Sequence, residues 1–435
     1  MWIVELLVVL FFIWFGARLG SIGIGYAGGF GVLVLSVVFG LKPGDIPTDV
    51  ILIIMGVIAA IAAMQEAGGL DYLVQVAARV LKSNPKYITF LAPVVTYWMT
   101  LFAGTGHTAF LALPVIAEVA KKEGIRPSRP LAIGTVASQI AITASPISAA
   151  VIFFASVLEP YGVDYVQLLL ITIPSSFIAC MLGAIVANFM GKELKDDPVY
   201  QERLAKGLVK QSSESAENKV LPPGAKLSVL IFGIAIICVV FYATAISPTV
   251  GLIKKPILAR DHAIITFMLA AASLIALLCK INAKNILNAA TFKSGMSACI
   301  CVLGVAWLGT TFVSAHLKEI NIVAGDLLAS KPWMLAVVLF FAAMLLYSQA
   351  ATTKALMPVA LALGVSPVAA IAAFASVSAL FVLPTYPTLL AAVEFDDTGS
   401  TRIGKYVFDH PFLIPGTLTI IFAVILGYVF AGVIL

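Results

Sequence analysis

The sequence predicts an all-α integral membrane protein with about 10 transmembrane helices and two re-entrant hairpins, arranged as two inverted repeats. Composition gives the class: 61% of the 435 residues are hydrophobic and 11% are charged, whereas a soluble domain carries about 25% charged residues. The apolar runs are long enough to cross ~30 Å of hydrocarbon as helices. They lack the period-two alternation of a β-barrel wall.

The apolar runs predict the spans in order. The first run begins at Trp2 with no basic residue before it and no small-residue cleavage site after it, so we expect a retained helix instead of a secretory signal. The expected spans are 2–16, 21–41, 47–66, 131–158, 165–190, 227–247, 262–281, 294–315, 367–395 and 412–434. The stretches 88–120 and 333–364 are apolar but interrupted by polar tips, and 191–226 is a hydrophilic linker predicted to be cytoplasmic.

Prolines recur in the same order in both halves of the chain. Four pairs lie 241–247 residues apart in similar apolar and polar surroundings, which favours an internal duplication. The pairs are Pro85 and Pro332, Pro114 and Pro358, Pro146 and Pro387, and Pro174 and Pro415. Each half holds five spans and one broken element, and an odd number of spans places the second half upside down relative to the first.

Loop charges set the predicted orientation, because cytoplasmic loops are enriched in Lys and Arg. The first broken element has basic residues on both sides, namely Arg79, Lys82, Lys86, Lys121, Lys122, Arg126 and Arg129, so both of its ends are expected in the cytoplasm. The second has balanced charges before it and none in the following "GVSP". This threading puts 191–226 inside and both termini in the periplasm, although Lys254, Lys255 and Arg260 in 248–261 oppose it.

The polar tips and proline breaks predict a binding site at the bilayer midplane. Non-helical backbone survives at membrane depth only inside protein or beside water, and paired breaks in inverted repeats are typical of transporter sites. Free helix N-termini there favour an anion. The expected substrate-binding residues are Gly104, Thr105, Gly106, His107, Thr108, Thr143, Ser145, Pro146, Ser348, Gln349, Thr352, Thr353, Lys354, Pro384, Thr385, Tyr386, Pro387 and Thr388.

Single residues of this set leave alternatives open. Small Ser, Thr and Gly residues also serve close helix packing. His107 is either a satisfied polar tip residue or a proton carrier, and its counterpart in the second half is Ala351. Lys354 is a candidate partner for a carboxylate, because an intramembrane charge is costly; the alternatives are that it snorkels or pairs with Glu394.

Other chemistry is not indicated. All five cysteines fall in apolar runs without a CxxC pair, which favours core residues over a disulfide framework or a metal site. We expect no cofactor, no catalytic residues and no nucleic acid partner. An intramembrane enzyme is disfavoured because neither HExxH nor GxSxG occurs. A channel and a carrier for another organic anion stay as competing hypotheses.

Motifs along nearly the whole chain resemble the anaerobic C4-dicarboxylate transporter family (Dcu), nearest its aspartate/fumarate-importing branch. They include "GARLGSIGIGYAGGFGVLVL", "ASPISAAV", "FKSGMSACICVLGVAWLG", "YSQAATTKALMPVALALGVSP" and "DDTGSTRIGKYVFDHPFLIPG". The tips followed by "LPV" and "MPV" are also similar to the wider ion-transporter superfamily. That superfamily often has Ser-Asn-Thr at its tips, whereas this chain has Gly-Thr-Gly and Ser-Gln-Ala.

The resemblance implies an antiporter in the bacterial inner membrane for fumarate, succinate, malate and aspartate. It implies exchange of external fumarate or aspartate for internal succinate by an elevator-type movement, and it leaves coupling to Na⁺ or H⁺ open. It assigns 88–190 and 333–435 to a transport domain and 1–87 and 227–332 to the scaffold of a homodimer. A regulatory sensor protein is a further candidate partner.

Overall fold

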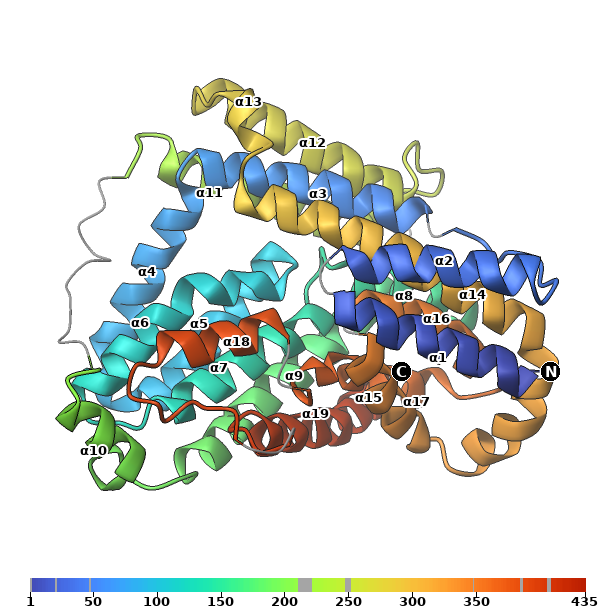
Figure 1. The fold of residues 1–435 in the computed structure, drawn as a ribbon. Helices are drawn as coiled ribbons and strands as arrows, with labels where there is room; N and C mark the ends of the chain where they lie inside the picture. The colour runs from blue at the N-terminus through green and yellow to red at the C-terminus, as the bar shows by residue number, and fades with distance from the viewer. Residues whose placement is uncertain are drawn as a thin grey trace.

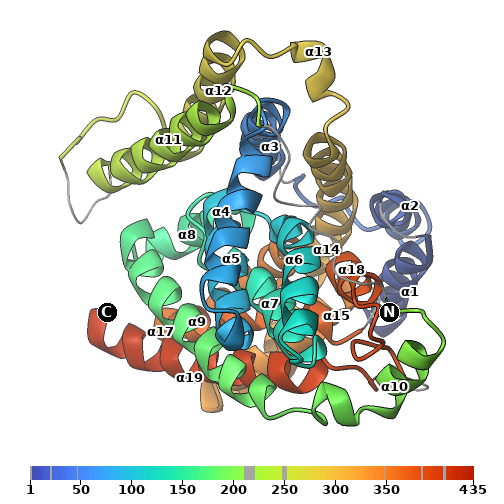
Figure 2. The ribbon, with the colours of Figure 1, turned by 90° about the vertical axis from the view of Figure 1, so that its left-hand side faces the viewer.

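The computed structural model describes residues 2–19, 22–46, 48–209, 221–246, 252–346, 348–383, 386–404 and 408–435, and every regular element in these ranges is helical. One group of helices, the upper group, begins at the top of Figures 1 and 2 and extends down the right-hand side of a second group, the lower bundle. The upper group is α2 (Gly23–Val37), α3 (Thr48–Glu66), α11 (Ala225–Ala245), α12 (Arg260–Leu278), α13 (Ala283–Ile286) and α14 (Ala290–Ser330), with α1 (Trp2–Leu19) packed on α2.

The lower bundle contains the interrupted elements that the sequence predicts. Its members are α4 (Gly69–Ser83), α5 (Ile88–Ala103), α6 (Ala109–Lys122), α7 (Ser128–Ile140), α8 (Ala149–Leu158), α9 (Tyr165–Asn188), α15 (Met334–Leu346), α16 (Gln349–Ala362), α17 (Pro367–Ala373), α18 (Pro387–Phe395) and α19 (Leu413–Ile434). The stretch 88–120 is thus two helices joined at a tip. The spans expected at 131–158 and 367–395 are each two helices separated by 3₁₀ turns, Ala141–Thr143 and Phe374–Phe381, and by non-helical residues.

Packing in the two halves corresponds pair by pair. Helix α2 packs on α14 as α12 packs on α3, and α1 packs on α2 as α11 packs on α12. In the bundle, α7 packs on α9 as α17 packs on α19, and α9 and α19 contact each other. Each hairpin also crosses to the other half, because α16 packs on α8 and α6 packs on α18. The broken elements of both halves therefore meet in the middle of the bundle.

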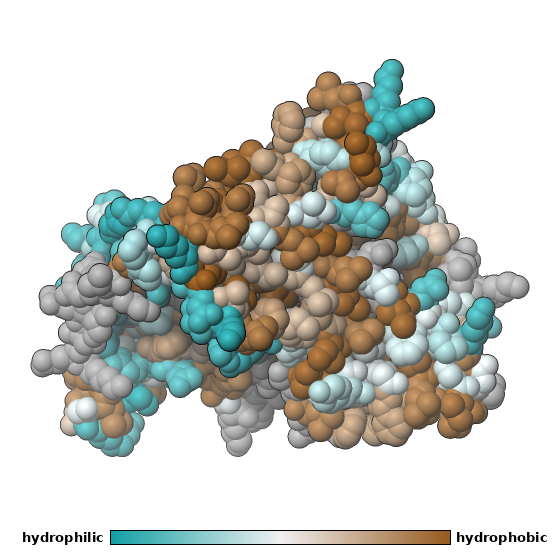
Figure 3. Space-filling view, turned by 90° about the horizontal axis from the view of Figure 1, so that it is seen from above, coloured by the Kyte–Doolittle hydropathy of each residue, from teal (hydrophilic) through white to brown (hydrophobic). Residues whose placement is uncertain are grey.

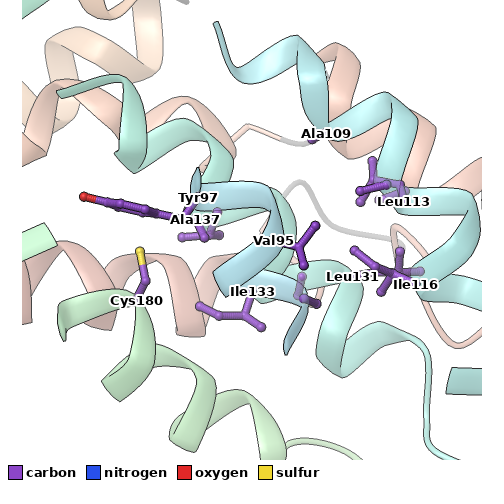
Figure 4. Packing of buried hydrophobic residues seen from close by; sticks show 14 of the residues in the cluster. Val95, Tyr97, Ala109, Leu113, Ile116, Leu131, Ile133, Ala137 and Cys180 are labelled. Atoms are coloured by element: carbon purple, nitrogen blue, oxygen red, sulfur yellow. The ribbon is translucent and has the colours of Figure 1, made fainter. Parts of the chain in front are cut away.

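The largest part of the bundle core joins α5, α6, α7 and α9 (Figure 4). Tyr97 of α5 is fully buried there, and its hydroxyl donates to the carbonyl of Ile173 (3.0 Å) and shares a hydrogen bond with Ser176 Oγ (2.7 Å). A buried phenol requires such partners, because an unsatisfied hydroxyl in an apolar core is costly. The contact fixes the first arm of hairpin 1 (α5–α6) on α9.

Three described helices are long and apolar enough to cross a membrane, namely 165–188, 225–242 and 413–434, and α3 and α4 pass the same criterion together although they are bent by 77°. The expected span 47–66 therefore continues into α4, which the sequence analysis missed. Likewise, α14 extends beyond the expected end at residue 315, with a non-helical kink at His316. Apolar side chains dominate much of the exposed face over α11 and α12, as a lipid-facing surface requires (Figure 3).

The start of the linker packs against the bundle instead of being fully solvated. Helix α10 (Pro198–Ala205) begins at Asp197, whose carboxylate pairs with Arg126 at 2.5 Å and lies 3.7 Å from Arg402. Burial raises the pKa of Asp197, but the N–H of Val199 and the two arginine charges lower it by more, so it lies below its usual range. The linker thereby ties the loop after hairpin 1 to the loop before α19.

Candidate functional site

The tip of hairpin 1 is a tight turn that lies against the first broken helix. Helix α5 ends at Gly104, which has a left-handed φ of 68°. A Cβ there would lie 3.0 Å from Ile147 Cγ1 and 3.2 Å from the Ile147 carbonyl oxygen. Both the conformation and the space therefore favour glycine. Beyond it, Thr108 Oγ1 donates to the carbonyl of Thr105 (3.1 Å) and lies 3.2 Å from Thr100 Oγ1; the His107 side chain is outside the described residues.

Hairpin 2 (α15–α16) presents a capped helix N-terminus at the equivalent place. Ser348 is the N-cap of α16, and its Oγ accepts from the N–H of Ala351 (3.1 Å). Thr352 Oγ1 donates to the carbonyl of Ser348 (2.8 Å), and Thr353 Oγ1 donates to that of Gln349 (2.6 Å). The hydroxyl protons are thus used within the helix, while the remaining first-turn N–H groups give this end positive partial charge.

The first broken helix is held open by its own polar residues, and its backbone is non-helical at 144–148, after the 3₁₀ turn Ala141–Thr143. Thr143 Oγ1 donates to the carbonyl of Ile140 (2.7 Å). Ser145 Oγ donates to the carbonyl of Leu101 (2.7 Å), which ties the break to hairpin 1. The carbonyl of Pro146 accepts from the hydroxyl of Tyr165 on α9. Pro146 leaves the carbonyl of Ile142 without a helical partner, and that carbonyl accepts from Ser148 Oγ (2.7 Å).

The second break ends at α18, where Tyr386 is the N-cap and Pro387 the first helical residue, as proline at that position favours. Thr388 follows and is fully buried. Pro384 and Thr385 lie outside the described residues.

All four elements converge on Gln139, a residue of α7 that the sequence analysis missed. Its Nε2 donates to Thr388 Oγ1 (3.1 Å), and its Oε1 accepts from Gln349 Nε2 (3.1 Å). Its backbone carbonyl accepts from Ser378 Oγ (3.1 Å) in the second broken element. A Cβ on Gly106, in the tip of hairpin 1, would lie 2.8 Å from Gln139 Nε2. We call Gln139, Gln349, Ser378 and Thr388 the glutamine cluster.

One local signal marks these missed residues. Gln139 is an amide within an apolar helix, seven residues before Pro146, the last residue of the "TASP" break. Ser138 and Ser378 are 240 residues apart, close to the offset of the proline pairs. The glutamine cluster is almost wholly buried, and Thr352 and Thr353 are completely so. A ligand therefore reaches these groups only if the tips move apart.

Lys354 is also buried, with 4% of the residue exposed, and its Nζ lies 5.4 Å from the centre of the Phe153 ring on α8. This is within the range of a cation–π contact. Glu394, the carboxylate considered as its partner, is exposed on α18. Burial does not fit a lysine that snorkels to the surface, and it places the charge between α16 and the first broken element.

A second polar region lies at the opposite end of α7, about 16 Å from Gln139 along the helix. A cavity of about 320 Å³ there is lined by Arg126, Arg129, Ser128, Ser400, Arg402, His410 and neighbouring residues. Its arginines already face carboxylates, since Arg129 pairs with Glu193 (3.0 Å) and Arg126 with Asp197 (2.5 Å). Lys121 at the end of hairpin 1 pairs with Asp397 (2.8 Å). Arg126, Arg129 and Lys121 each pair with a carboxylate, and these ion pairs hold the surrounding loops together.

Comparison with known proteins identifies the family. The family model described as "Anaerobic c4-dicarboxylate membrane transporter" matches residues 1–435. The chain belongs to this family of membrane transporters. It is 65% identical to the C4-dicarboxylate transporter DcuA of Wolinella succinogenes over all of both chains. It is 56% identical to DcuA of Escherichia coli K12 over 99% of both chains. Identity to the anaerobic C4-dicarboxylate transporter DcuB of Escherichia coli O6:H1 is 37%, over 99% of this chain and 98% of that protein.

A solved structure shares the fold of this transporter. The YdaH transporter of Alcanivorax borkumensis aligns with a TM-score of 0.59 over 99% of this chain and 97% of its own, at 15% identity. The predicted membrane class and family are therefore confirmed, and the chain is a transporter, as expected.

Replacing Gln139 by Met should abolish most transport, because it removes the amide that joins both hairpins to the second break. Gln349 Nε2 and Thr388 Oγ1 would lose buried partners at about 1–3 kcal/mol each, so we expect the initial succinate uptake per folded molecule to fall at least about tenfold. The assay is uptake into liposomes, normalised to protein amount.

Gln65→Met is the matched control. Gln65 Oε1 accepts from the N–H (3.1 Å) and the hydroxyl (2.6 Å) of Thr291, between α3 and α14. This variant should lose comparable stability and keep its rate. Wild-type transport by Gln139→Met would contradict a role for the glutamine cluster.

Proposed function

We propose that this transporter carries fumarate, succinate, malate and aspartate, and exchanges external fumarate or aspartate for internal succinate. The observation that carries this proposal is the convergence of two hairpin tips and two broken helices on Gln139, in a chain whose relatives are named for C4-dicarboxylate transport.

The polar site formed by the two hairpin tips and the two broken helices, here called the cradle, has chemistry that suits a dianion. The N-termini of α6, α8, α16 and α18 lie at the four breaks, and each carries about +0.5 of a charge. The hydroxyl proton of Thr352, now donated to the carbonyl of Ser348, would turn to a substrate carboxylate when the tips open. The Lys354 ammonium would then supply a full charge for the second carboxylate, since only two carbons separate the carboxyl groups of these substrates.

The same proposal includes an elevator movement. Residues 88–190 and 333–435 would form the moving transport domain, and 1–87 with 227–332 the scaffold, with 191–226 as the cytoplasmic linker. Most helix packing falls within the upper group or within the lower bundle, which supports this division, although α14 also packs on α16. Helix α4 of the scaffold packs on α11 and also on α5 and α6 of the transport domain, so the bend between α3 and α4 would be a hinge.

The test of the substrate is counterflow. Liposomes containing the purified transporter and unlabelled succinate should take up labelled fumarate and aspartate, and loss of internal succinate should stop the uptake. A channel would conduct without internal substrate. Uptake of labelled citrate with no uptake of fumarate would refute the C4-dicarboxylate proposal.

The tips are tested by removing single hydroxyls. Thr105→Val and Thr352→Val should each weaken the apparent affinity for fumarate by about one to two powers of ten, because a hydrogen bond to a charged group contributes ~1.5–3 kcal/mol. Lys354→Gln should weaken dicarboxylate binding more than monocarboxylate binding. Thr172→Val on α9, whose buried hydroxyl donates to the carbonyl of Leu168 (2.9 Å), is the control and should bind normally. Normal affinity in all three tip variants would place the substrate elsewhere.

We further propose inverted repeats with both termini periplasmic and the loops 121–130 and 191–226 cytoplasmic, supported by the loop charges. Single cysteines at the exposed positions Glu123, Ala205 and Tyr161 would be placed in a cysteine-free background. A membrane-impermeant thiol reagent added to intact cells should label position 161 only. Labelling at 123 together with protection at 161 would reverse the proposed orientation.

A further inference from the structure

A carboxylate and an imidazole meet inside the upper helix group, away from the glutamine cluster. Glu5 of α1 is 2% exposed, and its Oε2 lies 2.6 Å from Nε2 of His316 on α14. His316 is 8% exposed, and its ring centroid lies 4.9 Å from that of Phe312. Figure 1 shows α1 crossing α14 near the N-terminal end of α1, in agreement with their packing contact.

The charge of this pair depends on one proton. With His316 protonated, imidazolium and carboxylate form a neutral ion pair. Without that proton the imidazole is neutral, and a net negative charge stays buried against the apolar cluster that includes Val9, Phe12 and Phe312. An uncompensated buried charge strongly disfavours the arrangement that buries it. Proton binding and the α1–α14 contact therefore stabilise each other.

His316 lies at the kink of α14. It is the residue at which α14 leaves helical conformation, with φ −119° and ψ 21°. The segment beyond it leads into α15, the first arm of hairpin 2. The corresponding place in the first half is the 77° bend between α3 and α4, where Gly68 has φ 82°. The first hinge thus uses a glycine, whereas the second has a titratable side chain.

We propose that Glu5 and His316 form a proton-binding site that fastens the α14 hinge to α1. A proton bound at this pair stabilises the present angle of the kink, and its release frees the arm that carries hairpin 2. Intramembrane ionisable groups are costly and are retained for such roles. The site is separate from the substrate cradle, so the proposal does not depend on the substrate.

Other charged groups surround the pair. On α14 itself, Glu319 Oε2 lies 3.9 Å from His316 Nδ1. The sequences of α14 and of the helices packed against α1 and α14 contain further titratable residues, whereas that of α15 has none: Tyr26 of α2, Asp49 and Glu66 of α3, Lys293, Cys299, Cys301, Lys318 and Asp326 of α14, Lys354 of α16 and Arg18 of α1.

The expected sign follows from the direction of proton binding. Because the neutral ion pair requires the proton, the proposal predicts that the α1–α14 contact is more stable at low pH than at high pH. Melting temperatures of the purified full-length protein in nanodiscs should therefore fall from pH 5 to pH 8. Glu5→Gln and His316→Asn should each remove this component, and the double variant should match the single ones.

His262→Asn is the matched control, because His262 is exposed on α12; it should keep the wild-type dependence on pH. If the pair variants do not fold, hydrogen exchange of the unmodified protein decides. After correction for the intrinsic rate, the backbone amides of 309–316 should exchange at least about tenfold faster at pH 8 than at pH 5, because loss of one charge from a buried ion pair is strongly destabilising. Unchanged exchange, or pair variants that keep the wild-type pH dependence of melting, would overturn the proposal.

Discussion

Every interruption of a helix at membrane depth leaves polar backbone groups that the hydrocarbon cannot satisfy, and this constraint organises the whole lower bundle. A single break would have to satisfy itself with its own side chains, as Thr143 and Ser148 partly do. Four breaks placed together can satisfy one another. Gln139 makes this possible because its amide donates, its side-chain oxygen accepts and its backbone carbonyl accepts, each toward a different element.

The same constraint explains why each hairpin packs against the broken helix of the other half. Helix α16 lies on α8, and α6 lies on α18, so each hairpin covers the broken helix of the other half. Neither half forms a closed polar interior alone. The polar cradle therefore needs both halves of the chain. Separating the two hairpin tips would expose hydroxyl and N–H groups from both halves at once. Under the proposed function, such a cradle would bind a polar ligand in place of its own internal hydrogen bonds.

The sequence alone predicted the features that interrupt a local or periodic pattern of apolar residues. The tips, the prolines and the non-helical segment 144–148 all break an apolar pattern, so they are visible in the chain alone. Gln139 was missed because its meaning comes from Gln349 and Thr388, which lie more than 200 residues away. The bend into α4 and the ion pair of Arg126 with Asp197 were missed for a similar reason. Hydropathy finds a helix, but tertiary contacts decide where it bends and which charged loops it holds.

The repeats share a backbone plan but differ in chemistry at the places that matter. The offset of 240 residues that aligns Ser138 with Ser378 aligns Gln139 with Ala379, and Lys354 has no basic counterpart in the first hairpin, where Phe110 lies 244 residues before it. A symmetric pair of tips alone would present two equivalent ends to a ligand. One amide on one side and one ammonium on the other make the ends unequal. Duplication thus supplies the geometry that satisfies broken backbone, and the few residues without a counterpart give the cradle its polarity.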